Sequence, residues 1–299
     1  MTISAGLIDG FERRRLPGAG VEIDLLVGGS GPPLLLLHGY PQTRMMWKAV
    51  APLLAGRFTL VMPDLRGYGR SDKPADDPNH DNYSKRVMAT DQIAVMAALG
   101  FSSFFVAGHD RGGRVAYRLA LDHPQTVKRL ALLDILPTGD MWANADAASA
   151  MTYYHWYLLA QPAPIPERLI GADPRYYCTT MLQRLAGAGF AFDPECIEDY
   201  LSCFADPASL HATCEDYRAG WGPDRRHDEA DRGIRTIAVP TLLLWSAINS
   251  ITRSGPLDAW RRWAPDLRGH GLDCGHFIGD EDPAGVARAL TDFFDERPL

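Results

Sequence analysis

The chain has 299 residues, of which 46% are hydrophobic and 22% are charged. These proportions are typical of a globular protein with a large core, and the length suits an α/β enzyme with an insertion. The 37 acidic and 30 basic residues give a net charge of −7, which argues against nucleic acid or an anionic membrane as a partner. The N-terminal segment lacks the apolar region of a signal peptide, and every apolar run is too short to span a bilayer, so we expect a cytoplasmic protein.

The sequence contains five cysteines, an odd number, and no C-x-x-C pair. This pattern is typical of a protein from a reducing compartment. It argues against a disulfide framework and against a zinc knuckle.

Short apolar runs recur along the chain and leave room for helices between them. Uninterrupted Leu, Val and Phe are typical of strands in a parallel sheet that helices cover on both faces. The predicted strands are residues 33–39, 58–64, 103–110, 129–135 and 240–246. Helical patterns lie between them at 45–56, 84–100 and 112–124. The alternation predicts a doubly wound α/β sheet.

The alternation stops between about residue 138 and residue 230. That segment has no convincing strand and is rich in aromatic residues, proline and helix formers. It predicts a helical lid inserted between two strands, with the polar run DRRHDEADRG at 224–233 as its exit linker. The predicted domains are a core of residues 1–138 and 231–299 and a helical cap of residues 139–230.

The stretch AGHDRGGR, residues 107–114, joins a predicted strand to a predicted helix. The pattern G-x-nucleophile-x-G in this setting is typical of a nucleophile elbow, which lifts residue 110 above the carboxyl edge of the sheet. We expect Gly108 and Gly112 to let the strand and the helix approach closely. The nucleophile is then Asp110 rather than the usual serine, and capping of the following helix is its alternative role.

A second motif, LLLLHGYPQT, places His-Gly directly after a buried strand. In folds with a nucleophile elbow, this position supplies a backbone amide to the oxyanion hole. We expect the amide of Tyr40 to act there together with the amide of Arg111. The side chain of His38 is interpreted as structural.

A third group of residues supplies the base and the acid. His276, in a Gly-flanked loop near the C-terminus, is the predicted base, since nucleophile, acid and histidine then follow in the usual order. The usual loop for the acid holds no Asp or Glu between residues 245 and 257. Asp134, at the end of another apolar strand, is therefore the predicted acid, because a buried carboxylate needs a partner; capping the lid's first turn is its alternative role.

His109 is interpreted as structural. Five further histidines are interpreted as solvated or capping residues: His80, His123, His211, His227 and His270.

A carboxylate attacks acyl carbon poorly, but it can displace a leaving group from sp3 carbon. The product would be an alkyl ester of Asp110, which water activated by His276 then hydrolyses at the carboxyl carbon. Asp134 would stabilise the imidazolium that forms. Hydrolytic dehalogenation and epoxide opening are reactions of this type, and we expect no metal and no cofactor.

Several sequence blocks between about residues 33 and 277 carry a family resemblance. They are HGYPQT, DLRGYGRSDKP, AGHDRGGR, LDILPT, YHW…LAQPAP, CEDYRAG and GHF. The chain is similar throughout to the α/β-hydrolase superfamily, and it resembles in particular the fluoroacetate (haloacetate) dehalogenases. The resemblance implies an α/β-hydrolase fold, with a mostly parallel doubly wound sheet and an inserted helical cap. It also implies a homodimer that hydrolyses haloacetates to glycolate and halide.

The resemblance further implies two groups of binding residues. Arg111 and Arg114 would bind the substrate carboxylate from one face of a helix, at its positive end. Haloalkane dehalogenases and many epoxide hydrolases have Trp where this chain has Arg111. The lid residues that match the family's halide donors are His155, Trp156 and Tyr217.

Two lid positions are predicted to shape the pocket. Leu185 stands where family members often carry Trp, and we hypothesise that it enlarges the pocket for bulkier 2-haloacids or loosens the grip on fluoride. Tyr154 is the second position, although the tyrosines at 153, 154 and 157 are also interpreted as lid core. The loop at 246–252 has no interpretation.

Three alternatives remain open. An epoxide hydrolase would use Asp110 and His276, with lid tyrosines such as Tyr154 and Tyr217 protonating the epoxide oxygen. A non-catalytic receptor for small acids would keep the scaffold, but such proteins tend to lose members of the triad. A serine-type esterase is disfavoured because the elbow carries aspartate.

Overall fold

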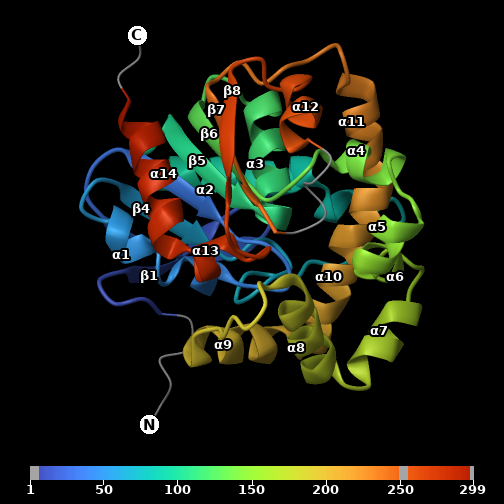
Figure 1. The fold of residues 1–299 in the computed structure, drawn as a ribbon. Helices are drawn as coiled ribbons and strands as arrows, with labels where there is room; N and C mark the ends of the chain where they lie inside the picture. The colour runs from blue at the N-terminus through green and yellow to red at the C-terminus, as the bar shows by residue number, and fades with distance from the viewer. Residues whose placement is uncertain (1–6, 249–254, 297–299) are drawn as a thin grey trace.

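A computed structural model describes residues 7–248 and 255–296 of the chain (Figure 1). An eight-stranded sheet with helices on both faces forms its centre, in the strand order β1-β2-β4-β3-β5-β6-β7-β8. The strands are β1 (Glu12–Pro17), β2 (Glu22–Gly29), β3 (Pro33–Leu37), β4 (Thr59–Pro63), β5 (Phe104–His109), β6 (Val127–Leu133), β7 (Thr241–Ser246) and β8 (Leu267–Leu272).

The sheet is parallel from β4 to β8, and β1 and β2 add an antiparallel edge. The five predicted strands correspond to β3–β7, so the doubly wound α/β sheet is confirmed. The edge strands β1 and β8 and the antiparallel strand β2 were not predicted. β1 reads ERRRLP and is mostly exposed, so it lacks the apolar run by which the central strands are recognised.

Outside the segment 138–231, the helices up to α12 lie in connections between strands, and α13 and α14 follow the last strand, β8. α2 packs against α3, and α1 packs against α14. The predicted helix at 45–56 is instead two short pieces, a 3₁₀ turn at Arg44–Trp47 and α1. The helices are α1 (Ala51–Leu54), α2 (Lys85–Ala98), α3 (Asp110–Asp122), α12 (Pro256–Arg261), α13 (Ile278–Glu281) and α14 (Pro283–Asp295).

The segment between β6 and β7, here called the helical insertion (residues 138–231), contains no strand among its residues. Its helices α6–α10 group beside one end of the sheet (Figure 1). They are α4 (Thr138–Ala143), α5 (Ala147–Thr152), α6 (Tyr154–Leu159), α7 (Ile165–Gly171), α8 (Pro174–Leu185), α9 (Pro194–Phe204), α10 (Pro207–Ala219) and α11 (Arg225–Asp231). The assignment of a separate cap domain to residues 139–230 stays a prediction.

The polar run at 224–233 is not a linker, and that prediction was wrong. It forms α11, which packs against the core because its acidic side chains are paired. Asp228 is buried, accepts the amide of Gly139 at 2.8 Å and accepts the hydroxyl of Tyr117 at 2.9 Å. Arg118 of α3 contacts both Asp228 and Asp231. The sequence did not indicate this packing because Arg118, which pairs with these acidic side chains, lies far from them along the chain.

The central strands bring the candidate residues together. Leu34, Leu35, Leu36 and Leu37 of β3 are fully buried and pair in register with β5, which in turn pairs with β6. Parallel strands end at the same edge of a sheet, where α/β proteins bind ligands. The residues that follow β3, β5, β6 and β7 therefore meet at this edge.

Two further expectations concern the chain as a whole. All five cysteines have free thiols, in agreement with the predicted lack of a disulfide framework. Across residues 7–248 and 255–296, none of the helices has the length and apolar character needed to cross a bilayer. Most of the loop at 246–252 lies outside the described residues.

Candidate active site

Asp110 lies at the junction of β5 and α3, the position predicted for the nucleophile. Its φ of 44° is in the left-handed region that residues other than glycine rarely adopt. A side chain at Gly108 would come within 2.5 Å of the carbonyl oxygen of Gly112, and one at Gly112 within 2.4 Å of the carbonyl oxygen of His38. The two glycines therefore allow the close packing of strand and helix that holds Asp110 in this strained turn.

The loop after β3 contacts the carboxylate of Asp110. The amide of Tyr40 donates to Oδ2 of Asp110 over 2.9 Å, and this leaves Oδ1 as the freer oxygen. Tyr40 is one of the two residues predicted for the oxyanion hole; the contribution of the other, the amide of Arg111, stays a prediction. Nε2 of His38 accepts the amide of Leu65 at 2.9 Å, so this side chain ties the loops after β3 and β4 together.

His276 and Asp134 form a hydrogen-bonded pair. Nδ1 of His276 lies 2.6 Å from Oδ2 of the buried Asp134. Oδ1 of Asp134 accepts the backbone amide of Ser246 at 2.9 Å. Ser246 belongs to the region 245–257, where the acid is usually found but where this chain has no Asp or Glu. In this protein, that region contributes a backbone amide that holds Asp134 in place. The contact with Asp134 favours the tautomer with the proton on Nδ1, which leaves Nε2 of His276 available as a base.

The loop of His276 is held by further contacts. Its amide donates to the carbonyl oxygen of Leu185 over 2.9 Å, and its carbonyl oxygen accepts from Nε2 of His109 over 2.8 Å. Oε2 of Glu281 accepts the neighbouring amide of Gly275 at 2.6 Å. His109 therefore supports the loop of the candidate base, and Leu185 joins that loop to the helical insertion.

Charges within the site set the protonation of the candidate nucleophile and base. Burial favours a neutral Asp110, but the nearby charges of His276 and Arg114 outweigh it and lower the pKa of Asp110. Burial likewise opposes a charged His276, but the hydrogen bond and charge of Asp134, with the charge of Asp110, raise its pKa above 6.5. Asp110 is therefore ionised at neutral pH, as a nucleophile must be.

A small cavity lies between the sheet edge and the helical insertion, with room for about one water molecule. It combines the carboxylate of the candidate nucleophile, an arginine, and aromatic side chains of the insertion. The cavity is lined by Tyr40, Asp110, Arg114, Asp134, Tyr153, His155, Trp156, Leu185 and His276.

Arg114 is the arginine that lines this cavity. Its guanidinium lies 4.4 Å from the centre of the Trp156 ring. Its Nη1 donates to the carbonyl oxygen of Leu136 at 3.0 Å and to Oγ1 of Thr138 at 3.1 Å. Its Nε is buried and has no hydrogen-bond partner among the residues described. This donor and the positive charge suit an anionic ligand.

Arg111 takes a different place from Arg114, and its role in binding the substrate carboxylate stays a prediction. Arg111 is fully buried and is outside the set of residues that line the cavity. It forms a bidentate ion pair with Asp216, from Nε to Oδ2 and from Nη2 to Oδ1, each at 2.8 Å. Only Nη1 remains without a hydrogen-bond partner within the described part of the chain. Because a carboxylate already neutralises Arg111, the charge that faces the cavity is that of Arg114.

The three residues predicted to bind halide lie close together. His155 and Trp156 line the cavity, and the ring of Tyr217 lies 5.8 Å from that of His155 and 5.7 Å from that of Trp156. Nδ1 of His155 and the hydroxyl of Tyr217 are buried without a hydrogen-bond partner in residues 7–248 and 255–296. Burial lowers the pKa of His155 to about 3, so this ring is neutral. Buried polar atoms usually have hydrogen-bond partners, so these two atoms suit a polar or anionic ligand, and their role as halide donors stays a prediction.

The prediction for Tyr154 needs correction. The cavity is lined by Tyr153, which was expected in the lid core, whereas Tyr154 is half-buried and lies 5.5 Å from the guanidinium of Arg184. Tyr153 stands between α5 and α6, so the periodicity of neither helix indicates its direction. Leu185, the other residue predicted to shape the pocket, does line it.

Sequence reasoning missed Asp216, although it lies within the block CEDYRAG beside Tyr217. Besides Arg111, its carboxylate pairs with the buried ammonium of Lys85 and accepts the hydroxyl of Tyr68 at 2.6 Å. The available signal was Arg111 itself, because a buried guanidinium requires an acidic partner.

Replacing Asp216 with asparagine is expected to lower the free energy of unfolding by about 3–5 kcal/mol, since two buried cations lose their shared anion. Urea denaturation measures this change. The matched control is Glu198→Gln, which breaks the exposed pair with Arg175 and should change the stability by less than about 1 kcal/mol. Equal effects of the two substitutions would contradict a central role for Asp216.

Several known proteins are similar to this chain over most of its length. The sequence model of the family described as alpha/beta hydrolase fold matches residues 32–283. Fluoroacetate dehalogenase from Burkholderia sp is 46% identical over 294 residues, which cover 97% of this chain and 96% of the relative. Soluble epoxide hydrolase from Corynebacterium sp. (strain C12) is 31% identical over 282 residues, covering 92% and 94% respectively. Among solved structures, ALR0039 from Nostoc sp PCC 7120 has a TM-score of 0.95 and 49% identity, covering 97% of this chain and 100% of that chain. The protein therefore belongs to the α/β-hydrolase fold family and is an enzyme related to fluoroacetate dehalogenase.

Proposed function

We propose that the protein hydrolyses haloacetates, such as fluoroacetate and chloroacetate, to glycolate and halide. The observation that carries this proposal is the carboxylate of Asp110, which shares one small cavity with Arg114. A carboxylate nucleophile selects an sp3 carbon with a leaving group, and a guanidinium selects a substrate that has a carboxylate. The 46% identity to fluoroacetate dehalogenase from Burkholderia sp supports this substrate class.

In the first step, Oδ1 of Asp110 attacks the carbon that carries the halogen. The new carbon–oxygen bond makes Asp110 an ester, and the halide leaves with the electron pair of the broken bond. The contact between the amide of Tyr40 and Oδ2 supports this assignment, since it leaves Oδ1 free to attack. His155, Trp156 and Tyr217 are the proposed donors to the departing halide.

Arg114 is the main group proposed to orient the substrate carboxylate. Its pKa is lowered, first by burial and then by the charge of Arg111. A substrate anion in the cavity would offset both effects, because it adds a second negative charge beside Arg114 to that of Asp110. Arg111 would contribute through its remaining donor, Nη1.

In the second step, water attacks the carboxyl carbon of the Asp110 ester. Esterification removes the negative charge that raises the pKa of His276, so Nε2 becomes a more available base for the proton of that water. The oxyanion forms on Oδ2, where the amide of Tyr40 can donate to it. Collapse releases glycolate, whose alkoxide oxygen takes the proton from the imidazolium. Asp110 keeps one oxygen from water and becomes a carboxylate again when the second proton of that water is lost to solvent. Asp134 stabilises the imidazolium meanwhile.

An epoxide hydrolase is the second candidate, favoured by the 31% identity to the enzyme from Corynebacterium. It would use the same nucleophile and base, with the buried hydroxyl of Tyr217 as proton donor to the epoxide oxygen. Arg114 in the cavity favours an acidic substrate instead, since an uncharged epoxide would leave its charge unpaired.

One pair of assays separates these functions. The purified protein is incubated with fluoro-, chloro- and bromoacetate, and halide is measured by ion chromatography; styrene oxide is incubated in parallel and the diol is measured. We expect halide release from haloacetates and little diol. Diol formation without halide would make the protein an epoxide hydrolase, and haloacetate binding without halide release over hours would make it a receptor.

Substituting Leu185 with tryptophan is expected to reduce the rate with 2-chloropropionate relative to chloroacetate by about tenfold or more, because a bulkier lining leaves less room for the extra methyl group. The ratio of kcat/KM for the two acids is the measurement. Met151→Trp, at a strongly exposed position of α5, is the control and should leave the ratio unchanged. An unaltered ratio in the Leu185 variant would refute the proposed role of this residue in pocket size.

A further inference from the structure

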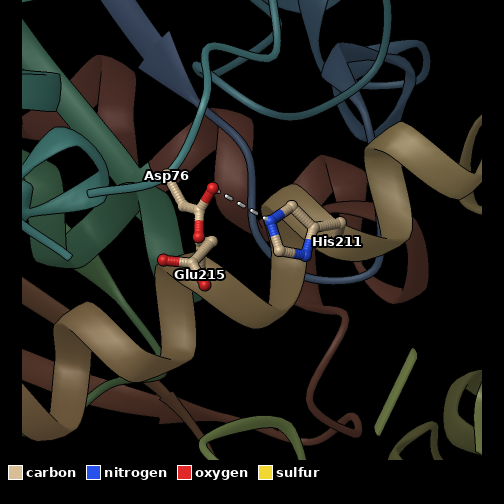
Figure 2. Close-up of side chains that lie close together, drawn as sticks. All are labelled: Asp76, His211 and Glu215. Carbon is tan, nitrogen blue, oxygen red and sulfur yellow. Dashed lines mark ion pairs between the residues drawn. The ribbon is translucent and has the colours of Figure 1, made fainter. Parts of the chain in front are cut away.

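A mixed cluster of histidine and carboxylate side chains lies outside the cavity of the candidate active site. His211 and Glu215 come from α10, and Asp76 comes from the connection between β4 and α2 (Figure 2). One potential ligand atom from each lies within 4.8 Å of the others. We propose that these three residues bind a divalent transition-metal ion, with zinc the best match, and that the metal ties this connection to α10.

The orientation of His211 is the first argument. Its Nδ1 lies 3.0 Å from Oε1 of Glu167, a hydrogen bond that places the ring proton on Nδ1. Nε2 then carries a lone pair, and it points toward Oδ1 of Asp76 at 3.8 Å, too far for a hydrogen bond (Figure 2). A metal ion between these two atoms would accept an electron pair from each of them. A histidine held by a second carboxylate in this way is the usual arrangement of a metal ligand.

The spacing of the atoms is the second argument. Ligands about 2.0–2.2 Å from a zinc ion at the tetrahedral angle stand roughly 3.3–3.6 Å apart, so the 3.8 Å between Nε2 of His211 and Oδ1 of Asp76 would need to shorten slightly to hold the metal. His211 and Glu215 are four residues apart on α10 and so share one face of this helix. Imidazole nitrogen with carboxylate oxygen is a donor set that suits zinc.

The charge of the cluster is the third argument. Glu215 is almost fully buried, and its carboxylate accepts from Nη1 of Arg218 at 2.7 Å and contacts Nδ1 of His80 at 2.6 Å. Arg218 also pairs with Glu167. With Asp76, three carboxylates therefore face one guanidinium and two imidazoles. This excess of negative charge, next to the partly exposed side chains of His211 and Asp76, suits a divalent cation.

From the sequence alone, His80 and His211 were interpreted as solvated or capping residues, and no metal was expected. The reaction was expected to need no metal, and the cluster lies outside the candidate active site. None of its three proposed ligands is among the residues that line the described cavity. The metal would be structural. It would hold the outer side of α10, the helix whose residues Asp216 and Tyr217 contact Arg111. The inference is independent of the proposed function.

The test uses the full-length protein after removal of metals with a chelator. Co²⁺ titration followed by visible absorption, and Zn²⁺ titration by calorimetry, should each show about one site per chain. His211→Ala and Asp76→Asn alter exposed or half-exposed side chains, and each should weaken binding by about tenfold or more. Glu167→Gln removes the partner of the histidine and should weaken binding by about tenfold. Zn²⁺ should raise the Tm of the wild type and leave that of His211→Ala unchanged.

Two controls make the outcome specific. His270→Ala removes an exposed histidine on β8 and should bind metal as the wild type does. His276→Gln should also keep the Co²⁺ spectrum, which excludes binding at the candidate active site. The absence of a saturable spectrum in the wild type, or equal affinity of a folded His211→Ala variant, would overturn the proposal. His211 would then be an imidazolium shared by Asp76 and Glu167.

Discussion

Replacing Asp110 with asparagine is expected to reduce halide release from chloroacetate by about four orders of magnitude or more, because removal of a covalent nucleophile abolishes the pathway it creates. Asparagine has nearly the same shape, and its side-chain oxygen can still accept the amide of Tyr40, so the turn should keep its structure. The measurement is the initial rate of halide release, with circular dichroism to verify the fold.

The matched control for this substitution is Asp280→Asn. Asp280 is a partly buried aspartate with hydrogen bonds to Gln42 and Tyr200, and it lies outside the cavity lining. Burial raises its pKa to about 7, so a neutral amide there resembles a form that the carboxyl group already adopts. Asp280→Asn should therefore keep most of the activity. An Asp110→Asn variant with activity within tenfold of the wild type would rule out the covalent scheme.

A single turnover in heavy-oxygen water tests the same step in the unmodified enzyme. The water oxygen should enter the carboxylate of Asp110 before it enters glycolate, since the second step attacks the carboxyl carbon of the ester. Mass spectrometry of the peptide that contains Asp110 detects the label. Label that reaches glycolate first would mean that water attacks the substrate directly.

The sequence predicted those parts of the fold and site that depend on local patterns. Apolar runs located the five central strands, because strands buried on both faces need uninterrupted hydrophobic residues. The glycines around Asp110 indicated the elbow, because their role depends on the backbone within a few residues. The acid was predicted as Asp134 by elimination, and the structure places it 2.6 Å from His276.

The features that the sequence did not predict depend on ion-pair partners that lie far away along the chain. Arg111 looked equivalent to Arg114 because both lie on one helical turn, but only the fold shows that Asp216, 105 residues away, neutralises Arg111. The polar run that contains α11 was interpreted as a linker because Arg118, the partner of its acidic residues, lies in α3, 110 residues before Asp228. The sequence shows which residues are charged, but the role of each charge depends on its burial and on its ion-pair partner, which only the fold shows.

Substituting His276 with glutamine is expected to convert the enzyme into one that reacts once. The first step needs Asp110 and a bound substrate but no base, so halide should still be released, up to about one equivalent per chain. The second step loses its base and should slow by about 10²- to 10⁴-fold. The Asp110 ester should therefore accumulate, and intact-protein mass spectrometry should show the added carboxymethyl group.

The order of events in this variant separates the two roles assigned to His276. In the wild type, its positive charge helps to hold Asp110 ionised, so its loss should also slow the first step somewhat. A stoichiometric burst of halide, with the mass increase located on the peptide of Asp110, would show that this electrostatic contribution is secondary to the role as base. His270→Gln, an exposed control on β8, should turn over steadily without a mass increase. Steady turnover by His276→Gln would contradict the assignment of the base, and a folded variant with neither burst nor ester would mean that alkylation itself depends on the imidazolium.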